Sequence, residues 1–214
     1  MQIIAVDNHL LVVHKPAGIP TQLSPQSDVN MTDRSKQWIK HTYHKPGNVF
    51  LEPIHRLDKP VSGLVVFART SKALSRLQQM MRERTIRKWY YAWVEHPLPA
   101  LEGVLEDYLV HDEYRARIVS SSHREAKKAE LSYKVMGSNA GGTLLEIELK
   151  TGRYHQIRAQ LSHAGSPIIG DNKYNSRKEW SSEGIALHHG RLMLTHPVTH
   201  EELTFFSSCP YFSV

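Results

Sequence analysis

Cysteine is nearly absent from this chain of 214 residues. The only one is Cys209, close to the C-terminus, so an internal disulfide is excluded. Such low cysteine usage is typical of proteins in a reducing compartment, and we expect the protein to be cytoplasmic. A catalytic thiol is not expected at a position so near the chain end.

Long apolar runs are also missing, and we expect no secretory signal. No segment approaches the roughly 20 apolar residues of a membrane helix. The first residues, Met1 to Asp7, carry neither a basic region nor a cleavage signature. We therefore expect no membrane partner. With 40% hydrophobic and 22% charged residues, the composition is that of a globular protein, and we expect a single domain over residues 1–214.

Positive charge is in excess. Twenty-seven Lys and Arg residues stand against 21 Asp and Glu, which gives a net charge of +6 and a pI near 9.4. This balance indicates a partner rich in phosphate. The 14 histidines raise the question of a metal. His196 and His200 have the i, i+4 spacing of two zinc ligands on one helix, but Pro197 disfavours a helix there. No second cluster of ligand residues completes a metal site. We expect no metal and no small-molecule cofactor.

The hydrophobic pattern predicts more strands than helices. Helices are expected over residues 34–44, capped by Thr32 or Asp33 with Trp38 and Ile39 on the buried side, over 71–84, capped by Ser71, and around Arg158. Strands are expected over residues 3–6, 10–13, 64–68, 89–94, 103–109, 114–119, 126–135, 143–149, 186–194 and 202–205, with a small strand and turn at 166–171. This order indicates an α+β fold with a mixed, mostly antiparallel sheet flanked by helices and loops.

The most unusual stretch covers residues 54–68. A charged first half passes through a Pro/Ser/Gly turn into an uninterrupted apolar run. Asp58 lies between Arg56 and Lys59, and flanking cations favour the ionised form of a carboxylate. Loops beside rigid strand ends often present reactive groups. Taken alone, the local sequence favours a plain turn carboxylate with solvated neighbours.

Two further polar clusters are separated from this stretch by predicted strands. They are Lys88-Trp89-Tyr90 and residues 152–158 (Gly-Arg-Tyr-His-Gln-Ile-Arg). Taken alone, Tyr90 could be an ordinary sheet aromatic and Arg158 a surface residue of a helix. A carboxylate, a tyrosine on a strand and an arginine on a helix could also converge in one cleft.

Five sequence motifs, found in order between Ile4 and Phe205, indicate a family more specifically than these clusters do. They are residues 12–18 (Val-Val-His-Lys-Pro-Ala-Gly), 55–58 (His-Arg-Leu-Asp) followed by Ser-Gly-Leu, 152–158, 165–174 (Gly-Ser-Pro-Ile-Ile-Gly-Asp-Asn-Lys-Tyr), and 186–188 (Ala-Leu-His) with a later His-Pro. Together they resemble the pseudouridine synthases that act on large-subunit rRNA and tRNA (the RluA type).

Two departures from the family pattern stand out. Val61 replaces the usual threonine, although the Ser-Gly that follows is kept. The RNA-binding module of the S4 type, present in many relatives, is not expected because the Lys-Pro-Ala-Gly motif already begins at Lys15. Target choice would then come from the catalytic domain or from another molecule.

The resemblance implies the pseudouridine synthase fold and isomerisation of uridine to pseudouridine in tRNA or large-subunit rRNA, by a monomer. Asp58 matches the catalytic carboxylate, Arg158 the arginine that pairs with it, and Tyr90 the tyrosine that lies against the base. Arg56 matches the residue that fills the space left by the extruded uridine. The RNA-binding residues expected on this basis are Arg56, Lys15, His55, Lys88 and Arg153. For Lys15, a structural role is the alternative to a phosphate contact.

Extraction of the uridine from its stack costs a few kcal/mol. Basic residues in 82–88 and 124–128 could offset this cost, which predicts salt-sensitive binding. Whether Asp58 attacks the ribose or the base, or removes a proton, is left open by the sequence. One alternative is an RNA-binding protein with a vestigial site. A second alternative is a hydrolase that uses His residues and Asp58, either metal-dependent or a glycoside hydrolase. A glycoside hydrolase needs a partner carboxylate, and the sequence offers no good candidate beside Asp58.

Overall fold

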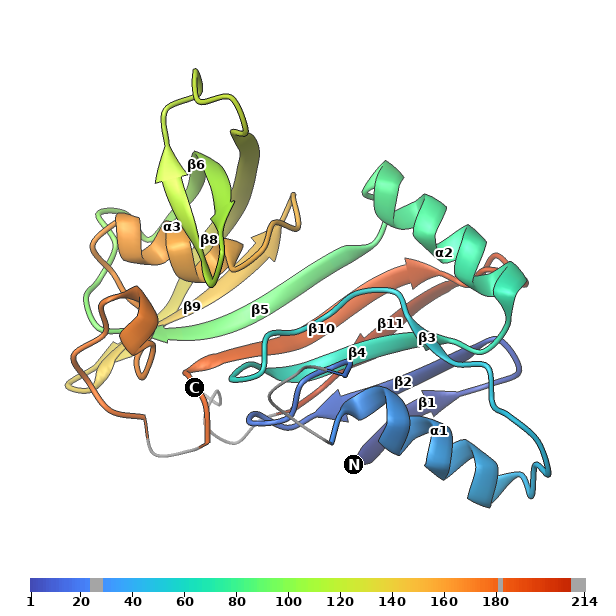
Figure 1. Ribbon diagram of the computed structural model, residues 1–214. Coiled ribbons are helices and arrows are strands. Elements are labelled where there is room, and N and C mark those ends of the chain that lie inside the picture. The colour runs from blue at the N-terminus through green and yellow to red at the C-terminus, as the bar shows by residue number, and fades with distance from the viewer. Residues whose placement is uncertain (24–28, 181–182, 209–214) are drawn as a thin grey trace. The chain divides into compact units, whose positions relative to one another are not determined.

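The computed structural model describes residues 1–23, 29–180 and 183–208, so Cys209 lies outside the described residues. The chain forms two compact units (Figure 1). The first unit consists of Met1–Ile86 with His189–Ser208, and the second of Arg87–His188. Each is described by itself, and the expected single domain over residues 1–214 stays a prediction.

The first unit is built on a sheet of short strands. Its order is β1 (Gln2–Val6), β2 (Leu10–Lys15), β4 (Ser62–Ala68) and β10 (Leu187–Thr195). β3 (Glu52–Pro53) pairs with β4, and β11 (Glu202–Phe206) pairs with β10, both antiparallel. β4 is buried along nearly its whole length, which explains why its sequence is continuously apolar instead of alternating.

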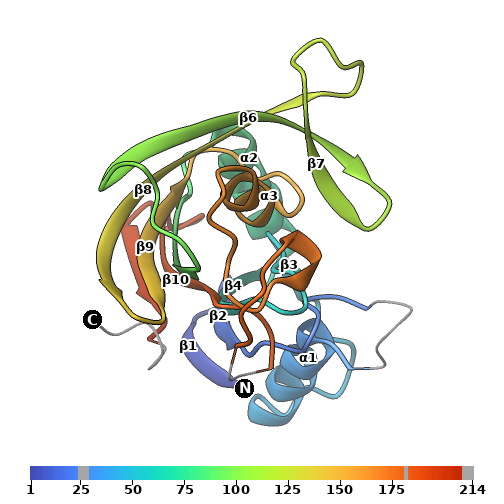
Figure 2. The same ribbon diagram turned by 90° about the vertical axis from the view of Figure 1, so that its left-hand side faces the viewer.

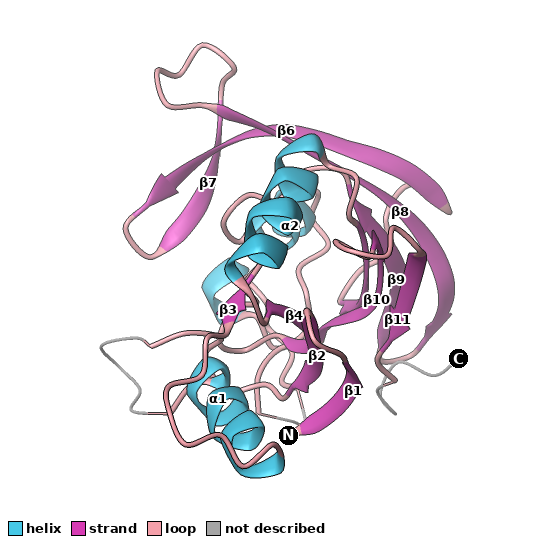
Figure 3. Cartoon of the chain, turned by 90° about the vertical axis from the view of Figure 1, so that its right-hand side faces the viewer, coloured by secondary structure: helices cyan, strands magenta, loops and turns pink. Residues whose placement is uncertain are grey.

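Two helices cover the opposite sides of this sheet (Figures 1 and 3). They are α1 (Met31–Thr42) and α2 (Ser71–Glu83). Ala73 and Leu77 of α2 pack in a core cluster with residues of β2, β4 and β10. Ile39 of α1 is fully buried, as predicted, whereas Trp38 is only half-buried.

Both predicted helix caps were wrong. The cap of α1 is Asn30, whose side chain accepts from the backbone N–H of Asp33 at 2.9 Å. The cap of α2 is Thr70, which accepts from Ala73 N at 3.1 Å. Ser, Thr, Asp and Asn all cap helices well. Where several such residues lie close together in the sequence, the backbone geometry determines which of them caps the helix.

Gly63 is required where β4 passes β10. Its φ is +119°, and a Cβ at this position would lie 2.3 Å from the carbonyl oxygen of His189. Gly63→Ala is therefore expected to destabilise the protein by about 2 kcal/mol or more, because both the backbone strain and the clash must be relieved. Urea unfolding would measure the loss. Gly47→Ala, where a Cβ meets nothing within 4 Å, is the control and should change stability little.

The second unit contains a long curved sheet of five strands. Their order is β5 (Arg87–Val94), β9 (Gly142–Leu149), β8 (Lys127–Asn139), β6 (Glu102–Asp112) and β7 (Arg115–Val119), and every neighbouring pair is antiparallel. Figure 2 shows α3 (Gln156–His163) on the concave side of β6 and β8. A short 3-10 helix, η1 (Asn172–Tyr174), follows. Ala159 and Tyr174 pack with Leu109, Ala116 and Ala129 in one core cluster.

The α+β prediction is confirmed. The expected strand at residues 166–171 is reduced to a single bridge between Ile168 and Val94, followed by a turn. β6 runs three residues and β8 four residues beyond the predicted C-terminal end. The added residues of β8 include Gly137, Ser138 and Asn139, which hide the strand pattern in the sequence. None of the helices in the described parts of the chain has the length and apolar character that a bilayer crossing requires.

Candidate active site

Asp58 lies in a loop of the first unit whose backbone is tightly held. The Asp58 carbonyl accepts from Val61 N at 3.0 Å, which closes a turn. The next carbonyl, of Lys59, accepts from Gly18 N at 2.9 Å and from Lys15 Nζ at 3.2 Å. Asp58 is half-buried and Arg56 is exposed. The Lys-Pro-Ala-Gly motif and the His-Arg-Leu-Asp motif are thus two halves of one local structure.

Lys15 is the centre of that structure. Its side chain is fully buried, and Nζ donates to the carbonyls of Pro16 at 3.0 Å, Ile19 at 2.7 Å and Lys59 at 3.2 Å. Burial lowers the pKa of Lys15 to about 7, while the nearby Asp58 carboxylate acts in the opposite direction. Three carbonyl acceptors match the three donors of an ammonium group. Lys15 has no exposed surface to offer a phosphate, and its contacts fit a structural role.

Thr21 holds the same loop from the other side. Its hydroxyl donates to Leu57 O and accepts from Leu57 N, both at 3.0 Å. The carbonyl of Thr21 accepts from the hydroxyl of Thr32 in α1 at 2.8 Å. The residue beside Asp58 is therefore fixed to the start of α1. Sequence reasoning missed this function of Thr21, which lies 36 positions from Leu57.

His55 contacts the strand that follows it. Its Nε2 accepts from Val66 N at 3.3 Å, and its ring lies edge-on to His189 with centroids 5.4 Å apart. His189 in turn contacts the carbonyl of Leu64 through Nδ1 at 2.8 Å. These contacts give His55 a place in the packing of the first unit, and the expected contact with RNA stays a prediction.

Tyr90 and Lys88 of the second unit are neighbours on β5. Tyr90 is paired with Ile147 of β9 and is 6% exposed. Lys88 is 8% exposed, and burial lowers its pKa. Its Nζ lies 3.7 Å from the point that a Cβ on Gly152 would occupy. The structure thus brings Lys88 to the start of the motif at residues 152–158.

Arg158 forms a buried, bidentate pair with Asp171. Its Nε donates to Oδ2 at 2.7 Å and its Nη2 to Oδ1 at 2.8 Å. Arg158 is 4% exposed and Asp171 is 1% exposed. The guanidinium also lies 4.9 Å from the centre of the Tyr174 ring. Two parallel hydrogen bonds fix the plane of the guanidinium, so Asp171 determines where Arg158 points.

The helix that carries Arg158 is itself anchored by two buried glutamines. Gln156 Oε1 accepts from the Thr151 hydroxyl at 2.8 Å and from Arg153 N at 2.9 Å. Gln160 Nε2 donates to Asp107 at 2.8 Å and to the carbonyl of Leu105 at 3.1 Å. Gln156 Nε2 also donates to the carbonyl of Glu130 in β8 at 3.1 Å, so the two glutamines hold α3 against β6 and β8. The Gln of the Gly-Arg-x-His-Gln-Ile-Arg motif is thus an anchor of the helix.

Arg153 is bound to the sheet as well. Its Nε donates to the carbonyl of Lys128 at 2.9 Å. Lys128 itself pairs with Glu106 at 2.9 Å and Glu130 at 3.3 Å. Arg153 therefore has a structural contact, and its expected contact with RNA stays a prediction.

His155 begins α3 in an uncommon backbone conformation, with φ of +49°. Its Nδ1 lies 2.9 Å from the hydroxyl of Tyr174. One face of the ring stacks on Tyr154 at a centroid distance of 3.8 Å. Burial, with smaller effects from Arg158, Lys173 and His111, lowers the pKa of His155 to about 3. His155 is therefore neutral near pH 7.

This neutral histidine predicts a loss of stability in acid. Because the pKa of about 3 in the fold lies below the ordinary value of 6.5, the unfolded chain takes up the proton first. The stabilisation is complete above 6.5 and declines as pH falls toward 3. The urea midpoints measured at about pH 7 and about pH 4.5 should differ less in His155→Asn than in wild type, because the variant lacks the titrating imidazole. Asn is chosen because it tolerates this backbone conformation. His200→Asn, exposed with φ of +64°, is the control and should keep the wild-type dependence.

The predicted site residues fall into two sets. Lys15, His55, Arg56 and Asp58 belong to the first unit, and Lys88, Tyr90, Arg153 and Arg158 to the second. Their convergence in one cleft stays a prediction. Within the described residues, no three His, Cys, Asp or Glu side chains come together in a group that could hold a metal ion.

Comparison with known proteins agrees with the motifs. A family model described as RNA pseudouridylate synthase matches residues 9–163. The uncharacterized RNA pseudouridine synthase YhcT of Bacillus subtilis is 34% identical over 206 residues, which cover 94% of this chain and 66% of YhcT. The tRNA pseudouridine synthase C of Vibrio parahaemolyticus is 32% identical over 232 residues, which cover 97% of this chain and 90% of that protein.

A solved structure supports the same assignment. Human RNA Pseudouridylate Synthase Domain Containing 4 superimposes with a TM-score of 0.82 at 26% identity, over 99% of this chain and 89% of the human one. The chain spans about two thirds of YhcT, at 66%, and nearly the full length of the Vibrio enzyme. The match from residue 9 to residue 163 includes both Asp58 and Arg158. The family prediction is confirmed: the chain belongs to the RNA pseudouridylate synthase family.

Proposed function

We propose that the protein isomerises uridine to pseudouridine in tRNA or large-subunit rRNA, with Asp58 as the catalytic carboxylate. The observation that carries the proposal is the held loop around Asp58, in which Lys15, Gly18 and Thr21 fix the flanking backbone. A catalytic group must be held close to its productive position by its surroundings. A solvated turn carboxylate would not need such support.

The substrate class comes from the relatives. The Vibrio parahaemolyticus relative is named a tRNA pseudouridine synthase. A relative from Vibrio cholerae, 28% identical over 94% of this chain, is named a ribosomal large subunit pseudouridine synthase. The net charge of +6 suits either RNA. Both RNAs are therefore tested as substrates.

The reaction needs few groups. The bond between C1′ and N1 of the uridine breaks, the uracil rotates and a bond between C1′ and C5 forms. The proton at C5 then leaves, and N1 takes up a proton. Atoms and electrons balance without an external donor. Asp58 acts on the extruded uridine as nucleophile or base. Tyr90 lies against the base, and Arg158 orients the catalytic carboxylate through its guanidinium.

Arg56 is the RNA contact in the first unit that this proposal favours, because its side chain is exposed. There it would occupy the space left by the extruded uridine. Lys15 is assigned a positioning role instead of a contact with RNA, since its donors are taken up by three carbonyls. The protein would act in the cytoplasm as a monomer.

Tritium release tests the proposal. The protein is incubated with tRNA and with large-subunit rRNA in separate reactions, each tritiated at uridine C5, in the presence of EDTA. Release of tritium from one of them, with pseudouridine at a defined position, is the expected result. RNA binding without release from either substrate would instead support a vestigial site.

A further inference from the structure

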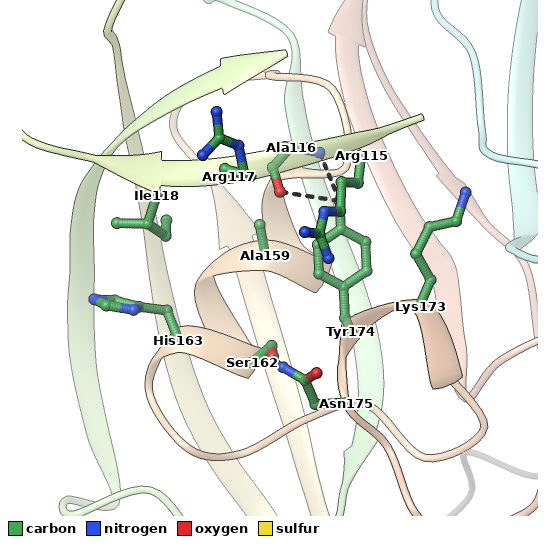
Figure 4. Close-up of a pocket in the computed structure, with 10 residues that line it drawn as sticks. All are labelled: Arg115, Ala116, Arg117, Ile118, Ala159, Ser162, His163, Lys173, Tyr174 and Asn175. Carbon is green, nitrogen blue, oxygen red and sulfur yellow. Dashed lines mark hydrogen bonds between the residues drawn. The ribbon is translucent and has the colours of Figure 1, made fainter. Parts of the chain in front are cut away.

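A pocket of about 410 Å³ opens on the second unit between β7, α3 and η1 (Figure 4). Neither Tyr90 nor Arg158 lines it. Its lining residues include three cationic side chains, Arg115, Arg117 and Lys173, one histidine, His163, and no acidic side chain. Such a concentration of one sign of charge around a hollow favours an anion.

The floor of the pocket is rigid. Ala116, Ala159 and Tyr174 are each less than 7% exposed, at 4%, 4% and 6%. The Tyr174 hydroxyl accepts from Ala116 N at 2.7 Å and contacts Ala116 O at 3.3 Å (Figure 4). It therefore covers the free edge of β7 at that residue, in the place that a further strand would take.

The same free edge presents a backbone donor to the pocket. In the antiparallel pair of β6 and β7, Ala116 is opposite His111 and Ile118 is opposite Leu109. Residues two apart on a strand point their N–H and C=O groups to the same side. The N–H of Ile118, another lining residue, therefore points to the free edge as that of Ala116 does.

The basic side chains differ in how far they are already engaged. Arg117 pairs with Asp112 at 2.8 Å. Lys173 donates to the carbonyl of Tyr114 at 3.0 Å, which leaves donors of its ammonium for a ligand. Arg115 is exposed, and in Figure 4 its side chain extends from β7 toward Tyr174. Arg115 and Lys173 are thus the two cations best placed to bind an added anion.

We propose that this pocket binds a backbone phosphate of the substrate RNA, through residues other than those proposed for the reaction; this rests on the proposed function. A guanidinium fork, an ammonium and a backbone N–H are the donors that proteins use for phosphate. The cations lie exposed at the rim, which suits a ligand whose bulk stays outside the pocket, as a polymer does. Such contacts fix the register of the RNA on the protein.

Arg115→Ala/Lys173→Ala tests the proposal by binding. The Kd for the substrate RNA is expected to rise roughly tenfold, and the slope of log Kd against log salt to fall by about one. The value of kcat at saturating RNA should stay within about twofold of wild type, because phosphate contacts position the RNA and take no part in the chemistry. Arg34→Ala/Lys40→Ala removes the same charges from exposed positions of α1 and should leave Kd near wild type.

Failure of the pocket proposal can be distinguished from failure of the proposed function. If wild type binds and converts RNA but the pocket variant keeps the wild-type Kd and salt slope, the pocket proposal is overturned. Inorganic phosphate alone provides a second arm. A rise in Tm with phosphate that is lost in the variant, together with an unchanged Kd for RNA, would assign the pocket to a free anion and also overturn the proposal. Absence of tritium release from wild type concerns Asp58 and the reaction, and leaves the binding comparison intact.

Discussion

Asp58→Asn is expected to reduce tritium release from the substrate RNA by more than about 10³-fold. The substitution keeps the size of the side chain and removes its charge, so the group can neither attack nor accept a proton. The loop around it is fixed by backbone contacts to Lys15, Gly18 and Thr21, none of which involves the carboxylate. RNA affinity should therefore remain close to wild type while the chemical step is lost. Stability should fall only modestly, because the carboxylate charge no longer supports the buried Lys15 ammonium.

The controls separate chemistry from folding. Asp33→Asn changes an exposed carboxylate on α1 in the same unit and should keep wild-type activity. Kd for the RNA and the urea midpoint are measured for both variants. Retention of more than about a tenth of wild-type activity in Asp58→Asn would contradict a catalytic carboxylate at this position.

The loop around Asp58 shows what sequence reasoning can reach and what it cannot. The motif alone identified Asp58 as a candidate and placed a buried strand after it. The supports come from residues far away in the chain: Lys15 reaches a carbonyl 44 positions on, and Thr21 reaches one 36 positions on. Long-range contacts of this kind depend on the strand pairing of β2 with β4, and no local pattern encodes them.

Lys15 illustrates how burial changes the expected role of a residue type. A lysine in a Pro/Gly loop of a basic protein is a candidate for binding phosphate, because lysine is seldom fully buried. Here two carbonyls of its own loop, of Pro16 and Ile19, and one of the Asp58 loop, of Lys59, surround Nζ. A loop that bends tightly enough to leave several carbonyls without strand partners needs a donor, and Lys15 supplies it.

Arg158 was expected to pair with Asp58, and that pairing stays a prediction. The structure adds Asp171, which takes two of the guanidinium donors. A signal for it existed, because Asp171 belongs to the Gly-x-Pro-Ile-x-Gly-Asp motif. The spacing of 13 residues spans a helix end and a turn, so the direction of the two side chains toward each other could not be derived from periodicity.

Asp171→Asn is expected to destabilise the protein by about 3 to 5 kcal/mol, because it leaves the buried charge of Arg158 without its partner. Arg158 and Asp171 are 4% and 1% exposed, so water cannot replace the lost carboxylate. Urea unfolding measures the effect. If the variant unfolds at the wild-type midpoint, the pair does not hold Arg158 in place.

The double variant Arg158→Gln/Asp171→Asn then separates stability from catalysis. Removal of both charges eliminates the uncompensated cation, and two amides can hydrogen-bond to each other, so most of the lost stability should return. Tritium release should not return, because the guanidinium proposed to orient the catalytic carboxylate is gone. Recovery of both stability and activity would show that Arg158 acts only as a structural partner of Asp171. Recovery of stability alone means that the buried pair exists to place a charged group where the reaction needs it, since an uncharged pair would serve the fold equally well.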